Sequence, residues 1–386
     1  MANYTAIARK QTVFVVEETT KGVLVPPTNT DLVISGGMAS INQQPAFTNS
    51  SNIRNSRDIL ERFQNKTPPG DWSCPVYVTP SGTAGTAPQE DMLLKSLMGA
   101  KTVNSGVSVV YSPALIKPSF SMWLRKDHTV FSLSGCTVGS AKFSLATTDG
   151  AKIELSGQGM VMGWAGTDET ASLIASGATS IPVLDAKKYT VGMYIEFEED
   201  GDILNNTAAG YRITAVNTDT NVLTIATGGV EEEIASGSIV RGWLPAGTEV
   251  GSPLSARKGY AKIDAVNVPV QSLDCSISDS PKYLDDEITI SGYVEDYAET
   301  ERSISGNMAL YFRQDDVGYF DDGLNDISKA LNMVVGDTAG SIIDIAMIKT
   351  SLSVPSITES DPTVALSVPY QALGDEGEDS LTITYK

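Results

Sequence analysis

The chain has 386 residues, of which 41% are hydrophobic and 19% charged, and its formal net charge is −20. This length and composition are typical of a folded protein of two or three domains, while so acidic a chain is poorly suited to gripping nucleic-acid phosphates. No run of about 18 apolar residues occurs, so we expect no membrane-spanning helix. The first residues lack the basic-then-apolar pattern of a secretion signal, so we expect synthesis in the cytoplasm.

The charge is unevenly spread along the chain. Residues 1–164 hold 14 Lys and Arg against 11 Asp and Glu, a net +3, whereas residues 165–247 carry −8 and residues 248–386 carry −15. Surfaces of opposite charge attract. The distribution therefore favours head-to-tail contact between the mildly basic part of one copy and the acidic part of another.

The first 70 residues predict short strands followed by a polar loop. Apolar runs at Thr12–Val16 and Asp31–Ile34 are typical of strands. Residues 42–70 are polar, and a loop of this length usually binds something or lacks order. Within it, the spacing of apolar residues from Ser56 to Phe63 predicts one amphipathic turn of helix, with Ser56 as its cap.

A strand followed by an acidic, helix-like segment occurs twice in the chain. The strand at 71–80 precedes a predicted helix at 88–99, which Gly99 ends, and the strand at 307–313 precedes a predicted helix at 321–331. A repeat of this length predicts two similar lobes, and repetition is a common basis of ring and tube assemblies.

The remaining segments also favour β structure. Strands at 143–145 and 152–155 flank Asp149-Gly150 and predict a hairpin. Further predicted strands are 178–184, 194–197, 211–216, 222–225, 265–268, 273–277 and 287–291, with a closing hairpin of 363–370 and 381–385 around the acidic turn 374–379.

We therefore expect a mainly β fold with two tandem lobes. Each lobe would be a β-sandwich or barrel with a flanking α-helix, the first at residues 1–164 and the second at 248–386. Residues 165–247 would form a small inserted β domain.

The residue types needed for catalysis are sparse. His128 is the only histidine and cannot pair with another in a zinc site, and no nucleophile elbow or phosphate-binding loop occurs. Cys74, Cys136 and Cys275 are predicted to be buried thiols without disulfides. The acidic run 198–202 lacks the spacing of a calcium loop. We expect no enzyme, cofactor or metal, although paired carboxylates acting on glycans stay open as an alternative.

Five segments carry a resemblance to a known family. They are Ser51–Arg57, Phe63–Ser73, the strand end Tyr77-Val78-Thr79-Pro80, Ala87–Gly99 and the predicted C-terminal hairpin Val364–Tyr385. A strand of this kind leading into a Pro-Glu-x-Asp-x-Leu-Leu-x-x-Leu-x-Gly helix resembles the major tail tube proteins of long, non-contractile-tailed bacteriophages (siphophage type). The resemblance covers residues 1–160 and 260–386.

The resemblance implies a structural virion protein of the phage tail. Such a subunit self-assembles into stacked rings whose inner strands join into one barrel, and genomic DNA crosses the hollow lumen without specific binding. Two lobes per chain would need three chains, a trimer with pseudo-sixfold symmetry, for each ring. The inserted domain would project outward, and the tail tip, terminator and tape-measure proteins would be further partners.

The resemblance also implies that the 42–70 loop reaches the adjacent ring. The candidate contact residues in this loop are Asn52, Arg54, Arg57, Arg62, Phe63 and Lys66. Candidate lumen-lining residues are alternate positions of 143–146, 152–155 or 342–348. The alternative hypothesis is a phage fibre, head-decoration or surface-binding β protein that uses the inserted domain to bind its ligand.

Overall fold

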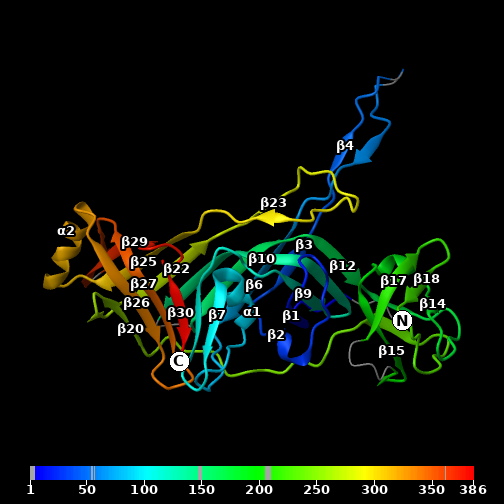
Figure 1. The fold of residues 1–386 in the computed structure, drawn as a ribbon, viewed down its shortest axis with the longest axis horizontal. Coiled ribbons are helices and arrows are strands. Elements are labelled where there is room, and N and C mark those ends of the chain that lie inside the picture. Colours follow the sequence, from blue (N-terminus) through cyan, green and yellow to red (C-terminus); the bar gives the residue numbers. More distant parts are fainter. Residues whose placement is uncertain (1–4, 54, 56, 147–149, 205–209, 361) are drawn as a thin grey trace.

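A computed structural model describes residues 5–53, 55, 57–146, 150–204, 210–360 and 362–386. The described chain is mainly β, as predicted, and each half contributes one helix, α1 (Asp91–Met98) and α2 (Gly318–Leu324). The short 3-10 turns are η1 (Asn29–Asp31), η2 (Ala186–Lys188) and η3 (Gln314–Val317). Figure 1 shows a broad body of strands with a thin arm rising from it and a separate small sheet at one end.

The first sheet is antiparallel and crosses both halves of the chain. Its order is β3 (Ser40–Asn42), β6 (Gly70–Tyr77), β11 (Lys152–Gly159), β10 (Thr129–Ala146), β22 (Ser272–Ser278), β25 (Ser303–Tyr311), β29 (Thr363–Leu373) and β28 (Ser356–Ser360). Alternate residues turn one face inward: in β6, Trp72, Cys74 and Val76 are buried while Asp71 is exposed.

The second sheet covers the buried face of the first. Its order is β7 (Gly99–Asn104), β8 (Ser108–Pro113), β30 (Thr382–Tyr385), β27 (Ile343–Leu352), β26 (Ser328–Val335), β20 (Gly259–Ile263) and β21 (Val266–Val268). One continuous apolar core lies between the sheets, and α1 adds Leu93, Leu94 and Leu97 to it. The C-terminal half of β27 also pairs with β29, so this strand joins the two sheets.

A third sheet is built on the first half of the 18-residue strand β10. Its order is β2 (Leu32–Val33), β1 (Gln11–Glu17), β9 (Phe120–Lys126), β10 and β12 (Val161–Ala165). The pairing register shifts between Leu133 and Cys136. Gly135 lies at this shift with a φ of 62°, which glycine adopts at little cost. The bulge lets one strand serve two sheets.

The small sheet lies within residues 167–242. Its order is β13 (Thr167–Glu169), β19 (Ile239–Gly242), β15 (Tyr194–Glu199), β17 (Tyr211–Asn217), β18 (Val222–Ile225) and β14 (Ser180–Pro182), with β16 (Asp202–Ile203) beside β15. Its core includes Phe14, Trp123 and Val130 from the third sheet. The small sheet is therefore packed against β1, β9 and β10.

Two strand pairs stand outside these sheets, β4 (Phe47–Asn49) with β5 (Arg62–Gln64), and β23 (Lys282–Tyr283) with β24 (Tyr297–Ala298). The first pair contradicts the helix predicted from Ser56 to Phe63. Residues 57–61 are not helical, Phe63 lies in β5, and Ser56 lies outside the described residues. This segment has no core to pack against, so its apolar spacing does not fold into a helix.

Three other local predictions are wrong. The predicted helix 321–331 ends at Leu324, and Leu331 lies in β26 because it is buried and pairs with β27. The predicted strand 287–291 is irregular, and Ile288 and Ile290 are fully exposed. The predicted closing hairpin does not form, since β30 pairs with β27 and β8 and not with β29. The hairpin of 143–145 with 152–155 is confirmed, although its Asp149 lies outside the described residues.

Candidate assembly surfaces

The first sheet repeats its own topology. The strand order β3-β6-β11-β10 is followed by β22-β25-β29-β28. In each set, a long excursion joins the first two strands. The second strand then leads through a helix and a hairpin of the second sheet to the last two strands, which are consecutive in the chain; in the first unit, β9 of the third sheet also intervenes after the hairpin. The sheet is thus two successive four-stranded units with the same strand order and similar connections.

The two units meet at a junction inside the chain and leave one free edge each. Strands β10 and β22 form the junction, where Phe143 lies opposite Cys275. Among the described residues, β3 pairs only with β6 and β28 pairs only with β29. In Figure 1, β29 lies at the left of the body and β3 to the right of its centre. Free strand edges are ready templates for pairing with another chain.

The face of the first sheet that points away from the core is polar and rich in serine. One row of directly opposed residues, here called the serine row, crosses six strands: Ser40, Ser73, Ser156, Ser140, Ser278 and Ser303. The hydroxyl oxygens of Ser40 and Ser73 lie 2.7 Å apart, and those of Ser140 and Ser156 lie 2.9 Å apart.

Charge on this polar face is nearly balanced. Lys142 lies opposite Glu154, and the other charged residues of the face are Asp71, Lys152 and Asp274. The side chains are exposed or half-buried, since the apolar core occupies only the opposite face. The polar face is therefore rich in small hydroxyl groups and carries little net charge.

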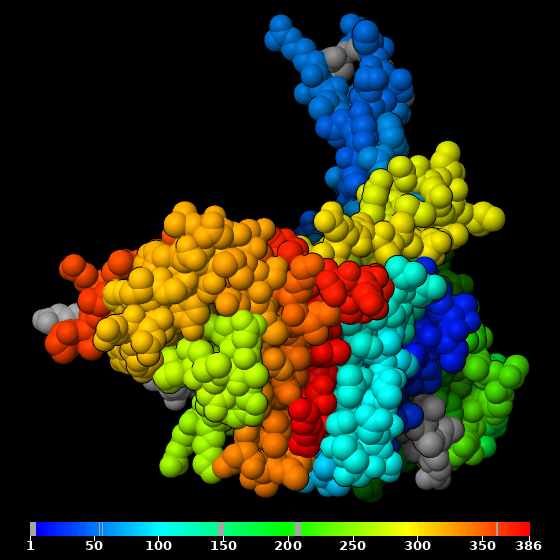
Figure 2. All heavy atoms as spheres, turned by 60° about the vertical axis from the view of Figure 1, so that its left-hand side comes forward, coloured from blue at the N-terminus to red at the C-terminus, as the bar shows by residue number. Residues whose placement is uncertain are grey.

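Residues 43–69 connect β3 to β6, and residues 43–66 of this connection are the arm that rises from the body in Figures 1 and 2. Strands β4 and β5 form its stem, where the Arg62 guanidinium lies 4.6 Å from the centre of the Phe47 ring. The arm exposes several large apolar side chains: Phe47, Ile53, Ile59, Leu60 and Phe63. Clustered exposed apolar residues are typical of protein-binding surfaces.

The predicted contact residues have different environments on the arm. Asn52, Arg57 and Phe63 are exposed. Lys66 instead holds the base of the arm, donating hydrogen bonds from Nζ to the carbonyl oxygens of Leu284 (2.9 Å) and Glu287 (2.7 Å). Arg54 lies outside the described residues.

Sequence reasoning missed the apolar residues that the arm exposes. Phe47 and Ile53 were overlooked because the segment as a whole is polar, and Ile59 and Leu60 were assigned to the apolar face of a helix and not to an exposed surface. Large apolar residues within a polar loop were the available signal. Whether the six predicted residues contact an adjacent ring stays a prediction.

The excursion between β22 and β25, residues 279–302, is here called the flap. It occupies the same place in its unit as the arm, yet it lies against the N-terminal half. Met160 packs with Tyr283, Val294 and Tyr297 in a small apolar cluster. The Tyr283 hydroxyl lies 2.8 Å from the carbonyl oxygens of both Gly135 and Gln158. The flap is therefore bonded along much of its length.

Additional contacts fix the flap near the base of the arm. The backbone N–H of Thr67 donates to the Gly292 carbonyl (2.9 Å). Lys21 pairs with Asp296 at 2.6 Å, and its Nζ lies 3.9 Å from the centre of the Tyr297 ring. The base of the arm thus lies against the middle of the flap.

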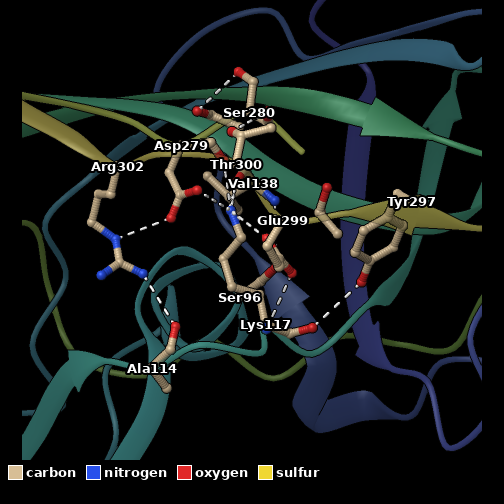
Figure 3. A network of polar contacts seen from close by, with 12 residues as sticks. Ser96, Ala114, Lys117, Val138, Asp279, Ser280, Tyr297, Glu299, Thr300 and Arg302 are labelled. Atoms are coloured by element: carbon tan, nitrogen blue, oxygen red, sulfur yellow. Dashed lines mark hydrogen bonds and ion pairs between the residues drawn. The ribbon is translucent and has the colours of Figure 1, made fainter. Parts of the chain in front are cut away.

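A buried set of charges, here called the charged clamp, holds both ends of the flap (Figure 3). Lys117 Nζ donates to the carbonyl oxygens of Val138 (3.1 Å) and Asp279 (2.6 Å). It also lies 3.4 Å from the Asp279 carboxylate and 3.7 Å from that of Glu299. Burial lowers the pKa of Lys117, and the two carboxylates oppose that effect.

Arg302 completes the charged clamp. Its Nε donates to Asp279 at 3.0 Å, and its Nη1 pairs with Glu378 at 2.9 Å. Its Nη2 donates to the Ala114 carbonyl at 3.2 Å. Buried charges are tolerated only when paired and hydrogen-bonded. The charged clamp meets this condition and ties the flap to the segment that joins β8 to β9.

The C-terminal strand is anchored to the N-terminal half through Glu90. The Tyr385 hydroxyl donates to Glu90 Oε1 at 2.5 Å, and the backbone N–H of Thr79 donates to the same oxygen at 3.1 Å. Burial raises the pKa of Glu90 to about 7. Beside it, the Tyr111 hydroxyl donates to Asp91 at 2.5 Å. Strand β30 is therefore fixed between the two halves.

The fold is that of a mainly β protein whose first sheet leaves two strand edges free, and the comparison with known families gives its class. A family described as phage tail tube protein matches residues 8–372. The chain belongs to this phage tail tube family, which places it among structural components of the virion tail. Among curated proteins, no match was found. No helix in the described part of the chain is long and apolar enough to cross a membrane.

Proposed function

We propose that this protein is the major subunit of a long, non-contractile phage tail tube, which polymerises into stacked rings around a hollow lumen. The observation that carries this proposal is the repeated first sheet with a free edge at each end. A repeated unit with two complementary edges adds copies head to tail, and the series ends only when it closes on itself. Membership of the tail tube family supports the same role.

Each ring would contain three chains. Residues 1–164 and 248–386 supply one four-stranded unit each to the first sheet, so three chains supply six units and pseudo-sixfold symmetry. Residues 165–247 would form the inserted domain and project from the outside of the tube. Closure of the ring would leave no free edges in the first sheet, which removes the aggregation hazard that they present.

The polar face of the first sheet would line the lumen. Lys152 and Glu154 lie on this face, whereas Ile153 and Leu155 point into the core and residues 342–348 fall in or beside β27 of the second sheet. Serine hydroxyls are neutral, and the few charges nearly balance. Such a surface gives DNA phosphates little to bind, so DNA would slide through during ejection.

Stacking of rings would use the arm. Its exposed apolar residues need a partner surface, and the arm extends far beyond the body (Figure 2). Asn52, Arg57 and Phe63 would then lie at the contact with the adjacent ring, together with Arg54. The tail tip, terminator and tape-measure proteins would bind the ends and the lumen of the finished tube.

Sedimentation of the purified protein over a range of concentrations and salt tests the proposal. A tube subunit forms polymers that pellet, in amounts that depend on both variables. A discrete oligomer of constant size that binds host cells would instead support a fibre or decoration protein.

A further inference from the structure

We infer that β28 of one copy pairs with β3 of the next copy, in the register already used inside the chain by β10 and β22. This inference rests on the proposed ring and names the strands and residues that close it. Its basis is that β10 and β28 occupy the same place in the two four-stranded units, as do β3 and β22. A junction built once within the chain is a template for the junction between chains.

The two units can be matched residue by residue, starting from β6 and β25. These strands end at Tyr77 and Tyr311, and aligning the two tyrosines places Trp72 at Gly306. The partners of these residues support the match, because Trp72 lies opposite Gly157 and Gly306 lies opposite Tyr370.

In each unit, therefore, a large aromatic residue lies opposite a glycine at this position. The aromatic residue belongs to the second strand of the first unit and to the third strand of the second unit. A Cβ added to Gly157 would collide with the Thr137 carbonyl oxygen and lie 3.0 Å from the Trp72 ring, and a Cβ added to Gly306 would collide with the Asp274 carbonyl oxygen and the Tyr370 hydroxyl. At both positions glycine therefore allows the close approach of a neighbouring strand and of the aromatic partner.

The match extends to the two free edges. Ile41 lies opposite Trp72 and Cys275 lies opposite Gly306, so Ile41 is the counterpart of Cys275.

At the other end, Ile357 lies opposite Leu366, as Phe143 lies opposite Ile153. Ile153 pairs with Val76 and Leu366 pairs with Leu310. Val76 and Leu310 each directly precede an aligned tyrosine, so Ile153 and Leu366 are counterparts. Ile357 is therefore the counterpart of Phe143.

Transferring the pair Phe143–Cys275 to the edges sets Ile357 opposite Ile41 of the next copy. The flanking pairs become Ser356 with Asn42 and Thr358 with Ser40. Apolar residues thus meet on the core side, and polar residues meet on the lumen side. The residue types at these edge positions were not used in aligning the two tyrosines, so they support the register independently. A slip by one residue would set Ile357 opposite a polar residue and reverse the faces.

Burial supports the same register. Ile357 is 57% exposed in the single chain, whereas its counterpart Phe143 is fully buried at the internal junction. Pairing with β3 of another copy would cover Ile357 in the same way. An exposed isoleucine on the core side of an edge strand is otherwise an aggregation hazard.

The stagger of the strands also suits closure. The serine row starts at Ser40 in β3 and reaches Ser278 in β22. When the two units are matched residue by residue, however, the residue of β22 that corresponds to Ser40 is Asp274, four positions earlier. The register therefore advances by four residues for every four strands. A barrel with shear 8 and eight strands has the same ratio and a strand tilt of about 36°. The repeated unit thus has the stagger of a closed barrel, whatever number of units completes it.

Disulfide cross-linking tests the register. Residues directly opposite in an antiparallel pair have Cα atoms roughly 4.5–5.5 Å apart, within the range of a disulfide. The native Cys74, Cys136 and Cys275 are buried and free, so they leave a low background. We expect oxidised tubes of Ser40→Cys/Thr358→Cys to give covalent dimers and trimers on non-reducing gels, with each single variant remaining monomeric.

The control pair, Ser40→Cys/Ser356→Cys, is two residues out of register and should link at least fivefold less. Asn42→Cys/Ser356→Cys reads the predicted register a second time if the first pair assembles poorly. Normal tubes in which neither in-register pair links, or in which the shifted pair links better, would overturn the register and leave the tube function intact. Failure of the unmodified protein to form tubes would count against the proposed function itself.

Discussion

Lys117 and Asp279 form a buried ion pair that joins the N-terminal half of the chain to the start of the flap. Their side chains are 1% and 2% exposed, and each has a further charged partner, Glu299 for the lysine and Arg302 for the aspartate. The arm and the flap are equivalent connections in the two units, and the charged clamp is one of the contacts that hold the flap flat while the arm projects.

Replacing Lys117 by methionine should therefore be costly. The variant leaves the Asp279 and Glu299 carboxylates with one cation fewer in a buried site, and we expect a loss of about 3 kcal/mol in the free energy of unfolding. Lys21→Met is the matched control, because its pair with Asp296 is largely exposed and should contribute less than about 1 kcal/mol. Urea unfolding measures both, and equal losses in the two variants would argue against the charged clamp.

Glu90 should make stability depend on pH. Its folded-state pKa of about 7 lies above the ordinary value of 4.5. Between these two pH values, the folded protein therefore keeps a proton on Glu90 that the unfolded chain has already released. This contribution is fully present below about pH 4.5 and is lost as pH rises through about 7, an effect on the order of 3 kcal/mol. Glu90→Gln should remove it. Unfolding of both proteins at pH 5 and pH 8 is the measurement, and identical changes with pH would contradict the assignment.

The arm should be needed for stacking and not for folding. Leu60→Asp/Phe63→Asp places charge on its apolar surface, and we expect rings or short stacks in place of long tubes, with unchanged circular dichroism. Leu173→Asp is the control, since Leu173, between β13 and β14, is 58% exposed and Phe63 is 56% exposed. Electron microscopy gives the length distribution. Long tubes from the double variant would show that the arm does not connect rings.

Removing residues 166–242 should leave tubes that are thinner on the outside. Thr167 lies opposite Arg241, so the two ends of the deletion are close and a short Gly-Ser linker can join them. The deletion uncovers Phe14, Trp123 and Val130, so we also expect lower solubility. Tube diameter in micrographs is the readout. A folded deletion variant that forms no tubes would place the small sheet within the ring contacts.

Local patterns predicted the elements whose own residues determine them. The α1 helix and its stop at Gly99, which has a φ of 96°, follow from an apolar face and a residue that tolerates the left-handed region. The pairs β10–β11 and β17–β18 follow from apolar alternation around a turn. The buried state of Cys74, Cys136 and Cys275 was also predicted and is confirmed.

Long-range partners could not be read from the sequence. The strand at 381–385 was identified, but its place between β27 and β8 depends on residues more than 30 positions away. The serine row is visible only once the registers of six strands are known. The flap was misread as a strand at 287–291, because Ile288 and Ile290 alternate with polar residues yet find no core.

The most direct test of the central claim is electron microscopy of the purified protein with symmetry analysis of end-on views. We predict hollow tubes built of threefold rings, each with six similar lobes around the lumen. Discrete particles without a lumen at any concentration would contradict the tube function, and sixfold rings of twelve lobes would contradict three chains per ring.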